Sequence, residues 1–443
     1  MGRDMTEQAG GPHFWDLHQY KTDTVASPSS GREPQKLRLT LDADAMLLFW
    51  IALRSVVLSI LTIGIYRFWM ITRMRRFYWG AIRIGGDPLE YTGRGIEKLL
   101  GFLLALVILA VYLGLVNLGL TFVGLSIASD DPIATQLALN LSVLATLPLI
   151  FYALYRSQRY IMARTRWRGI RFGLGPGAWG YVVRGMLLTL LTLLTLGLAY
   201  PYQQFKLAKY VTDRAYFGDL PFAQEGSWKE LFAQWMWIYI IGGIGAVLVW
   251  GLIDNPEDTT AAFLGTLALA FGATIMVVAY FRYQISAFRI LWSNRTLGLA
   301  RFENDLAPAR VVGIYLGGGL LVSICTGVVG AAIGFAVFYG LNQVLDPAAM
   351  QALIAAEGEL TTAQLMEAWP IFAAFVLTYL LIIGFAFAFT QIFIHLRVLR
   401  AKVEGMMLVD PEALLESRQR EHDPSAEAGG FADALGVDIG AGI

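Results

Sequence analysis

The sequence predicts an all-α fold, a polytopic bundle of membrane helices. Hydrophobic residues make up 56% of the 443 residues and charged residues only 15%, against about 25% charged residues in an ordinary soluble domain. Because about 20 apolar residues are needed to cross the hydrocarbon of a bilayer, each long uncharged apolar stretch is a candidate span. Six such stretches occur, at residues 99–125, 137–155, 231–253, 261–281, 311–341 and 369–394.

The loops between these stretches are of two kinds. Cytoplasmic loops of membrane proteins collect Lys and Arg, so the basic loops and both termini are expected on the cytoplasmic side. The loop at residues 156–184 holds seven arginines and no acid. The other basic loops are residues 67–98 and 282–310, and the loops without Lys or Arg are residues 126–136, 254–260 and 342–368.

Two further apolar segments, residues 45–66 and 182–200, do not fit this arrangement. If either crossed the membrane, cytoplasmic segments would fall on opposite sides of it. We expect both to enter and leave on the cytoplasmic side, as re-entrant or interfacial helices. The predicted bundle then has about six transmembrane helices in three hairpins plus these two helices. The alternative is eight ordinary spans.

The two short segments also begin matching stretches of sequence. A constant offset of 133 residues aligns residues 62–93 with residues 195–226 without a gap. Both stretches run in the same sense, so the match predicts an internal parallel repeat. Gly and Pro end helices and form turns, and most of the matched residues that carry this prediction are of these types: Thr62, Gly64, Gly85, Pro88 and Gly93 with Thr195, Gly197, Gly218, Pro221 and Gly226.

The chain accordingly divides into five predicted regions. A polar, mixed sequence predicts a disordered cytoplasmic tail at residues 1–40. The first membrane repeat is expected at residues 41–178 and the second at residues 179–310. A third transmembrane hairpin follows at residues 311–400, and a polar cytoplasmic tail at residues 401–443.

Sequence patterns typical of enzymes and cofactor sites are missing. The four histidines form no His-Glu-x-x-His zinc motif, and the single cysteine, Cys325, cannot build a thiolate site. The chain has no phosphate-binding P-loop and no Gly-x-Ser-x-Gly elbow. A formal net charge of zero gives no reason to expect a nucleic-acid partner. We therefore predict a protein that is not an enzyme and has no metal or cofactor.

Five basic residues are candidates for binding a lipid headgroup or an anionic substrate. Arg54 lies inside an apolar segment, where a charge costs roughly 2.5–3.5 kcal/mol on insertion scales; alternatively, its side chain reaches the membrane surface. The other four lie on stretches where basic and aromatic residues alternate at helical spacing, which suits a helix in the membrane interface. They are Arg73, Arg76, Lys206 and Lys209. The alternative is that such basic residues only fix the topology.

A family resemblance rests on the Thr-Ile-Gly and Thr-Leu-Gly helix endings, the basic aromatic stretch after each, and the turn at residues 85–93. These features resemble the YjgN family of bacterial inner-membrane proteins, whose function is unknown. The resemblance covers about residues 41–400. It implies a location in the bacterial inner (cytoplasmic) membrane, and as a partner a membrane-associated peptidase of the M48 type.

Two functions remain open from the sequence. The first is a transporter or channel for a small or anionic solute, which the repeat and Arg54 favour. The second is a non-enzymatic scaffold that organises anionic membrane lipids or a partner such as the peptidase, which the basic stretches favour. A continuous polar cavity would support the first function, and a solid packed interior would support the second.

Overall fold

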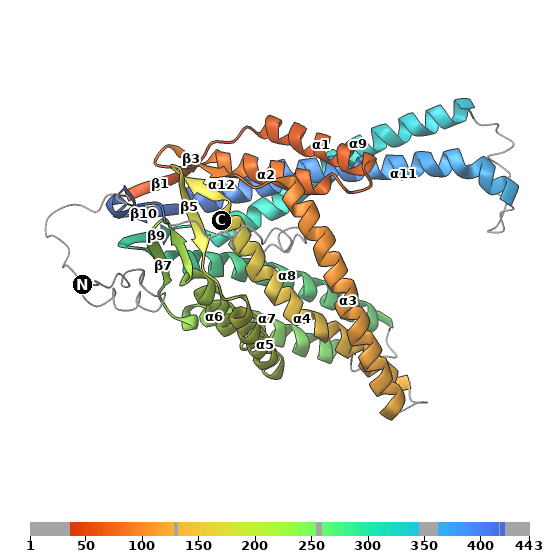
Figure 1. Cartoon of the computed structure of the whole chain (residues 1–443). Coiled ribbons are helices and arrows are strands. Elements are labelled where there is room, and N and C mark those ends of the chain that lie inside the picture. The colour runs from red at the N-terminus through yellow and green to blue at the C-terminus, as the bar shows by residue number, and fades with distance from the viewer. Residues whose placement is uncertain (1–35, 128–131, 254–258, 345–361, 416, 421–443) are drawn as a thin grey trace, which may run out of the picture. The chain divides into compact units, whose positions relative to one another are not determined.

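The computed structural model describes residues 36–127, 132–253, 259–344, 362–415 and 417–420. Pairs of helices alternate with short strands along these residues (Figure 1). The helices are α1 (Ala45–Leu61), α2 (Arg67–Ala81), α3 (Gly95–Ile127), α4 (Pro132–Ala163), α5 (Ala178–Leu194), α6 (Tyr200–Thr212), α7 (Trp228–Ile253), α8 (Thr259–Ser293), α9 (Pro308–Val344) and α11 (Thr362–Thr390). Helix α11 continues into the π-helix η2 (Gln391–Leu396) and α12 (Arg397–Glu404), and α13 (Glu412–Leu415) lies near the end of the chain.

The strands form a closed antiparallel barrel of ten strands in the described part of the chain. Strands neighbouring in sequence are neighbours in the barrel, and β1 pairs with β10 to close it. The strands are β1 (Lys36–Leu41), β2 (Ile82–Ile84), β3 (Asp87–Tyr91), β4 (Thr165–Trp167), β5 (Ile170–Leu174), β6 (Ala215–Phe217), β7 (Leu220–Gln224), β8 (Arg295–Leu297), β9 (Ala300–Asn304) and β10 (Met406–Val409).

Two-residue turns join the strands of four hairpins in this barrel. Both turn residues have positive φ in the first two hairpins, at Gly85 and Gly86 and at Arg168 and Gly169. In the other two, a glycine with positive φ comes first, Gly218 or Gly298. These are the turn geometries whose twist matches that of paired strands. The local sequence of each hairpin therefore determines its turn, and we call the end of the barrel where the four turns lie its turn end.

Side chains fill the interior of the barrel. Along β1, Leu37, Leu39 and Leu41 point inward because alternate residues of a strand face opposite sides. Aromatic rings continue this core across the strands, with centroids 4.7 Å apart for Phe172 and Phe217 and 6.3 Å apart for Phe222 and Phe302. The barrel is therefore a hydrophobic core, as closed sheets of this size commonly are.

Every helical pair leaves the barrel and returns to it at the end opposite the hairpin turns. Helix α1 follows β1, α2 leads into β2, and these two strands pair. The same holds for α3 with α4, α5 with α6, α7 with α8, and α9 with α12. Asp44 starts α1 by accepting hydrogen bonds from the backbone N–H groups of Met46 and Leu47.

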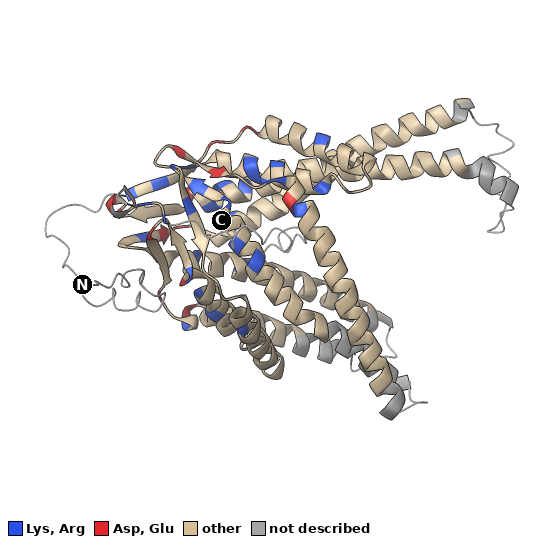
Figure 2. Ribbon diagram, viewed as in Figure 1, with Lys and Arg blue, Asp and Glu red and all other residues tan. Residues whose placement is uncertain are grey.

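Four helical segments among the described residues are long and apolar enough to cross a membrane: Gly95–Val123, Phe263–Ser293, Pro308–Leu341 and Ile371–Glu404. At most 11% of the most apolar window in each is buried. So much exposed apolar surface marks the chain as a membrane protein. Lys and Arg gather instead on the strands and on the helix ends next to them (Figure 2).

The predicted all-α bundle of six spans, two re-entrant helices and an internal repeat is wrong as an architecture. The structure contains a closed barrel, and four helical segments of the described residues, rather than six, meet the criteria for a span. Residues 137–155 and 231–253, predicted as spans, lie in α4 and α7, which are not among the four. The strands escaped prediction because most have three to five residues, too few for a period of two to register.

Several predictions fall on residues that the structure does not describe. They concern most of the predicted tail at residues 1–40 and the end of the tail at residues 401–443, together with much of the three loops without Lys or Arg.

Candidate functional site

Three tyrosines pack together where α4, α5 and α6 meet the barrel. Tyr155, Tyr181 and Tyr210 are all buried, and their ring centroids lie 5.5 to 6.0 Å from one another. We call this group the tyrosine triangle. Leu174 at the end of β5 and Ala215 at the start of β6 pack against it. The triangle is thus fixed by three helices and two strands.

Two of these phenols hold the loop that connects β5 to α5. The hydroxyl of Tyr155 donates to the carbonyl oxygen of Gly175 at 2.6 Å, and that of Tyr210 donates to the carbonyl oxygen of Gly177 at 2.8 Å. Gly177 has φ +151°, and a Cβ there would lie 2.8 Å from the Tyr210 hydroxyl. The loop reaches this position because glycine has no side chain.

Two arginines contact the ring of Tyr210. The guanidinium carbon of Arg214 lies 3.6 Å from the ring centroid and that of Arg184 lies 4.6 Å from it, both within cation–π distance. Their hydrogen bonds go to backbone carbonyls of their own helical segments, from Arg184 to Gly180 and from Arg214 to Tyr210. No acidic side chain of the described residues pairs with either guanidinium.

A third arginine adds to the positive charge of this site. Arg159 on α4 is 5% exposed, and its Nε donates to the carbonyl oxygen of Leu174 at 3.0 Å. A guanidinium carries five N–H donors in a planar fork that suits phosphate and carboxylate groups. Two guanidiniums that contact one ring repel each other, and an anion beside them reduces this repulsion. The arrangement is therefore chemically suited to hold an anion.

A neighbouring cluster differs because it contains its own acid. Glu97 accepts hydrogen bonds from the Tyr160 hydroxyl at 2.8 Å and from Arg164 at 3.1 Å. Burial raises the pKa of Tyr160, and Tyr91 and Glu97 raise it further. Lys98 is fully buried beside Tyr91, with its ammonium 5.5 Å from the ring centroid. The carboxylate of Glu97 offsets positive charge here, whereas Arg184 and Arg214 have no such acidic partner among the residues that the structure describes.

Arg295 at the start of β8 is a half-buried cation near the helix end of the barrel. Its Nε donates to the side-chain oxygen of Gln224 at 3.2 Å, and its guanidinium lies 4.2 Å from the ring centroid of Trp292. Desolvation lowers the pKa of Arg295 to about 10. The guanidinium of Arg295 therefore stays protonated at neutral pH, and this end of the barrel carries half-buried positive charge.

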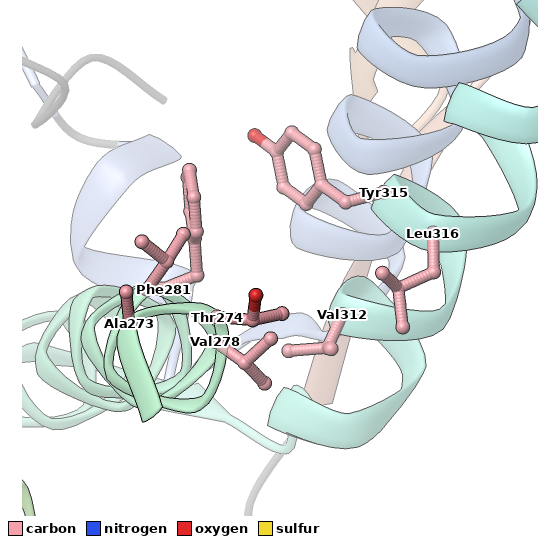
Figure 3. A pocket seen from close by; sticks show the side chains of 8 residues that line it. Ala273, Thr274, Val278, Phe281, Val312, Tyr315 and Leu316 are labelled. Atoms are coloured by element: carbon pink, nitrogen blue, oxygen red, sulfur yellow. The ribbon is translucent and has the colours of Figure 1, made fainter. Parts of the chain in front are cut away.

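The cavity described for this chain has a different character. It is an apolar groove of about 400 Å³ between α8 and α9 (Figure 3). Phe281 and Tyr315 contact each other there, with ring centroids 5.5 Å apart. The remaining residues that line it are Ala273, Thr274, Val277, Val278, Val312 and Leu316. The groove contains no charged side chain, so it is not the polar cavity that the transport hypothesis requires.

The five predicted binding residues do not form one site. Arg54 on α1 is exposed, as are Arg73 and Lys206, which lie 5.8 Å from the ring of Tyr66 and 5.4 Å from the ring of Tyr202. Arg76 donates to the carbonyl oxygen of Gly93 at 3.2 Å, and Lys209 donates to that of Gln224 at 2.6 Å. Arg76 and Lys209 thus attach α2 and α6 to the backbone at the ends of their hairpins.

The matched turn residues take local structural positions. Thr62, Gly64, Thr195 and Gly197 form the turns between the short helices. Gly85 and Gly218 lie in hairpin turns, Pro88 and Pro221 lie on β3 and β7, and Gly93 and Gly226 lie just before α3 and α7. None of them belongs to the tyrosine triangle.

Sequence reasoning missed Arg159, Arg184 and Arg214 as site residues. It used the first two, as part of a basic loop of seven arginines without an acid, to set the topology and did not single them out as binding residues. A loop with unbalanced charge over 29 residues, adjacent to Tyr155, was the available signal. The contribution of Tyr210 and Arg214, more than 50 residues from Tyr155, required the fold.

A family model of bacterial proteins of unknown function (DUF898) matches residues 36–434. The chain belongs to this family. The match starts at the first residue of β1 and extends past α13, so the barrel and every described helix lie within the DUF898 region. The predicted resemblance to the YjgN family is confirmed, because YjgN-like proteins are members of DUF898. No curated protein and no solved structure matches the chain significantly.

Proposed function

We propose that this protein is a non-enzymatic membrane scaffold that binds anionic phospholipid headgroups, with Arg184 and Arg214 as the contact residues. The observation that carries this proposal is the pair of guanidiniums on the Tyr210 ring without an acidic partner among the described residues. Anionic lipids attract basic groups near the membrane surface by about 1 kcal/mol per residue. A phosphate beside the two arginines relieves their mutual repulsion.

The surroundings of the site favour a lipid over a soluble anion. Trp179 at the start of α5 is 70% exposed and contacts Tyr152, with ring centroids 5.4 Å apart. Exposed tryptophans next to basic residues are typical of the membrane interface. Beyond the site, α5 presents exposed apolar side chains at Val183, Leu187 and Leu190. A headgroup at the arginines would therefore have its acyl chains beside an apolar helix face.

The same charge distribution orients the protein in this proposal. Lys and Arg gather at the barrel (Figure 2), and basic segments face the cytoplasm in bacterial inner-membrane proteins. We therefore propose that the barrel and the headgroup site face the cytoplasmic leaflet. The filled interior of the barrel supports a scaffold rather than a transport pathway through the barrel.

The test is binding of the purified protein to vesicles of phosphatidylglycerol and to vesicles of phosphatidylcholine. The double variant R184Q/R214Q should bind the anionic vesicles about 30-fold more weakly, since two basic residues contribute about 2 kcal/mol. Binding of the unchanged protein should also fall as the salt concentration rises. The phosphatidylcholine vesicles show how much binding depends on lipid charge.

The matched control is Arg168→Gln. Arg168 is also an exposed arginine beside an aromatic ring, but it forms an ion pair with Asp87 at the turn end of the barrel. Its replacement should leave lipid affinity unchanged. Equal affinity of R184Q/R214Q and the unchanged protein for anionic vesicles, with the fold intact by circular dichroism, would refute the proposed headgroup site.

A further inference from the structure

The turns between α1 and α2 and between α5 and α6 have the same unusual backbone geometry. Ile63 and Leu196 both have φ +51°, and the glycines after them, Gly64 and Gly197, have φ +85° and +91°. In both turns the glycine N–H bonds back five residues at 2.7 Å, to Ser59 or to Thr192. This bond marks a Schellman helix ending, whose left-handed position usually holds glycine or asparagine.

Each turn also satisfies its own backbone N–H groups. All six N–H groups at residues 62–67 bond within the hairpin, and so do all six at residues 195–200. The hydroxyl of Thr62 donates to the carbonyl oxygen of Leu58 at 2.7 Å and accepts the N–H of Tyr66 at 2.9 Å. Thr195 does the same with Leu191 and Ala199. No water is needed to complete these donors.

The side chains at both turns are large, apolar and exposed. Ile63 is 95% exposed and Leu196 is 87% exposed. Their neighbours extend the same apolar surface, at Leu61 and Ile65 in the first turn and at Leu194 and Leu198 in the second. A left-handed backbone disfavours Ile and Leu. Both turns nevertheless have one of these residues at the left-handed position, so each turn keeps an apolar surface at a cost in backbone strain.

We propose that these two apolar tips insert into the hydrocarbon of the lipid bilayer. Hydrocarbon requires every backbone polar group to be satisfied within the protein, and both turns meet this requirement for their N–H groups. Hydrocarbon also favours large apolar side chains at the two left-handed positions, where glycine would be favoured in water. Both tips project from the end of the barrel from which the four candidate spans also project.

Contacts of the second tip place it beside helices of the membrane part. The indole N–H of Trp235 donates to the carbonyl oxygen of Gly197 at 3.2 Å, and the Tyr239 hydroxyl donates to that of Leu196 at 2.6 Å. Both residues lie on α7, and Trp235 contacts Tyr283 on the candidate span Phe263–Ser293, with ring centroids 4.7 Å apart. The carbonyl groups of Leu196 and Gly197 are thus also satisfied by protein groups.

The test measures the depth of each tip in a bilayer. In a Cys325→Ala background, single cysteines at Ile63, Leu196 or Leu299 carry a polarity-sensitive fluorophore, and the full chain is reconstituted into phosphatidylethanolamine and phosphatidylglycerol vesicles. Leu299 is the control because it is 77% exposed in a hairpin turn at the opposite end of the barrel. Lipids brominated in the acyl chain should remove most of the fluorescence at the two tips but not at Leu299, and aqueous iodide should do the reverse.

Two outcomes would overturn this inference. Quenching of the tip probes by iodide would place the tips in water, and shielding from both quenchers would mean that a second copy or a protein partner covers them. The variants Ile63→Gly and Leu196→Gly separate insertion from folding, because glycine suits the positive φ. They should keep the unfolding temperature in detergent but reduce bromine quenching of a probe at Leu61 or Leu194, respectively.

Discussion

At the left-handed positions of the two tips, two opposing free energies can be compared. A left-handed backbone costs an L-residue such as Ile63 or Leu196 roughly 1–2 kcal/mol. Moving an exposed Ile or Leu side chain out of water gains about 1.5–3 kcal/mol. In water only the first term applies, and glycine would be the more stable residue. In hydrocarbon the second term is the larger one, which accounts for the same choice at both turns.

Gly177 controls the geometry of the headgroup site at the scale of one residue. Gly177→Ala should lower the free energy of unfolding by about 1–3 kcal/mol, since its φ of +151° suits only glycine. The added Cβ would also lie 2.8 Å from the Tyr210 hydroxyl and displace the ring that carries Arg184 and Arg214. Affinity for anionic vesicles should therefore fall together with stability.

The control for this substitution is Gly86→Ala in the β2–β3 turn. Gly86 also has a positive φ, +90°, but a Cβ added there would meet nothing within 4 Å. Chemical denaturation should show a loss of stability of roughly 1–2 kcal/mol from the backbone alone, while lipid affinity stays unchanged. A Gly177→Ala variant with unaltered lipid binding would contradict the role of the loop in placing Tyr210.

The candidate site could be predicted only in its chemistry, not in its members. Interleaved basic and aromatic residues were interpreted as a helix in the membrane interface, and the contacts of Arg73 and Lys206 with tyrosine rings were not part of that prediction. The site itself combines Arg184 on α5 with Tyr210 on α6 and Arg214 in the turn between α6 and β6. One sequence carries no signal for that proximity, because it arises from the pairing of β5 with β6.

At the scale of elements, a π-helix joins two parts of the fold. Gln391 is the first residue of η2, is 8% exposed, and its side-chain oxygen accepts the Tyr78 hydroxyl at 2.6 Å. This bond links α2 to the end of α11, and π-helical turns often occur at sites with a special role. Tyr78→Phe should cost about 1–3 kcal/mol of unfolding free energy, since it leaves the buried amide oxygen of Gln391 without its donor.

A double-mutant cycle measures this link. The variant Gln391→Leu alone should also be destabilising, because it leaves the buried Tyr78 hydroxyl unpaired. The double variant Y78F/Q391L should be less destabilised than the sum of the two single variants, since neither polar group then remains. Strictly additive losses in chemical denaturation would show that the two side chains do not interact.

Long elements could be predicted from the sequence, and short elements could not. Helices α3, α8, α9 and α11 contain predicted spans because more than 20 apolar residues leave a signal in any window. A strand such as Ile82–Ile84 has three residues and follows directly after a helix, so periodicity cannot separate the two. The two-residue turns, Gly85-Gly86 and Arg168-Gly169 among them, were the available signal for hairpins.

At the scale of the whole molecule, one contact between distant parts of the chain closes the barrel. Strand β1 at Lys36–Leu41 pairs with β10 at Met406–Val409 and with β2 at Ile82–Ile84. All other neighbours in the barrel are also successive strands in the sequence. No local pattern in the sequence indicates a pairing over more than 360 residues, which explains why β1 was predicted to belong to a disordered tail.

A designed disulfide tests this closure. Arg38 and Met407 are directly paired on β1 and β10, and paired residues of antiparallel strands have Cα atoms about 4.5–5.5 Å apart, within the range that a disulfide spans. In a Cys325→Ala background, R38C/M407C should form an intramolecular disulfide on oxidation, seen as faster migration on a non-reducing gel. Oxidation should raise the free energy of unfolding by about 2–4 kcal/mol, because the bond closes a long loop.

The matched control pairs Arg38→Cys with Arg166→Cys. Arg166 lies on β4, which is separated from β1 by β2 and β3, so the two cysteines should not react with each other under the same oxidation. Equal migration of oxidised and reduced R38C/M407C would show that the barrel is open between β1 and β10. In that case β1 and β10 would each have a free strand edge. The helical pairs on either side of this opening would then lose the constraint that directs them to the same end of the barrel.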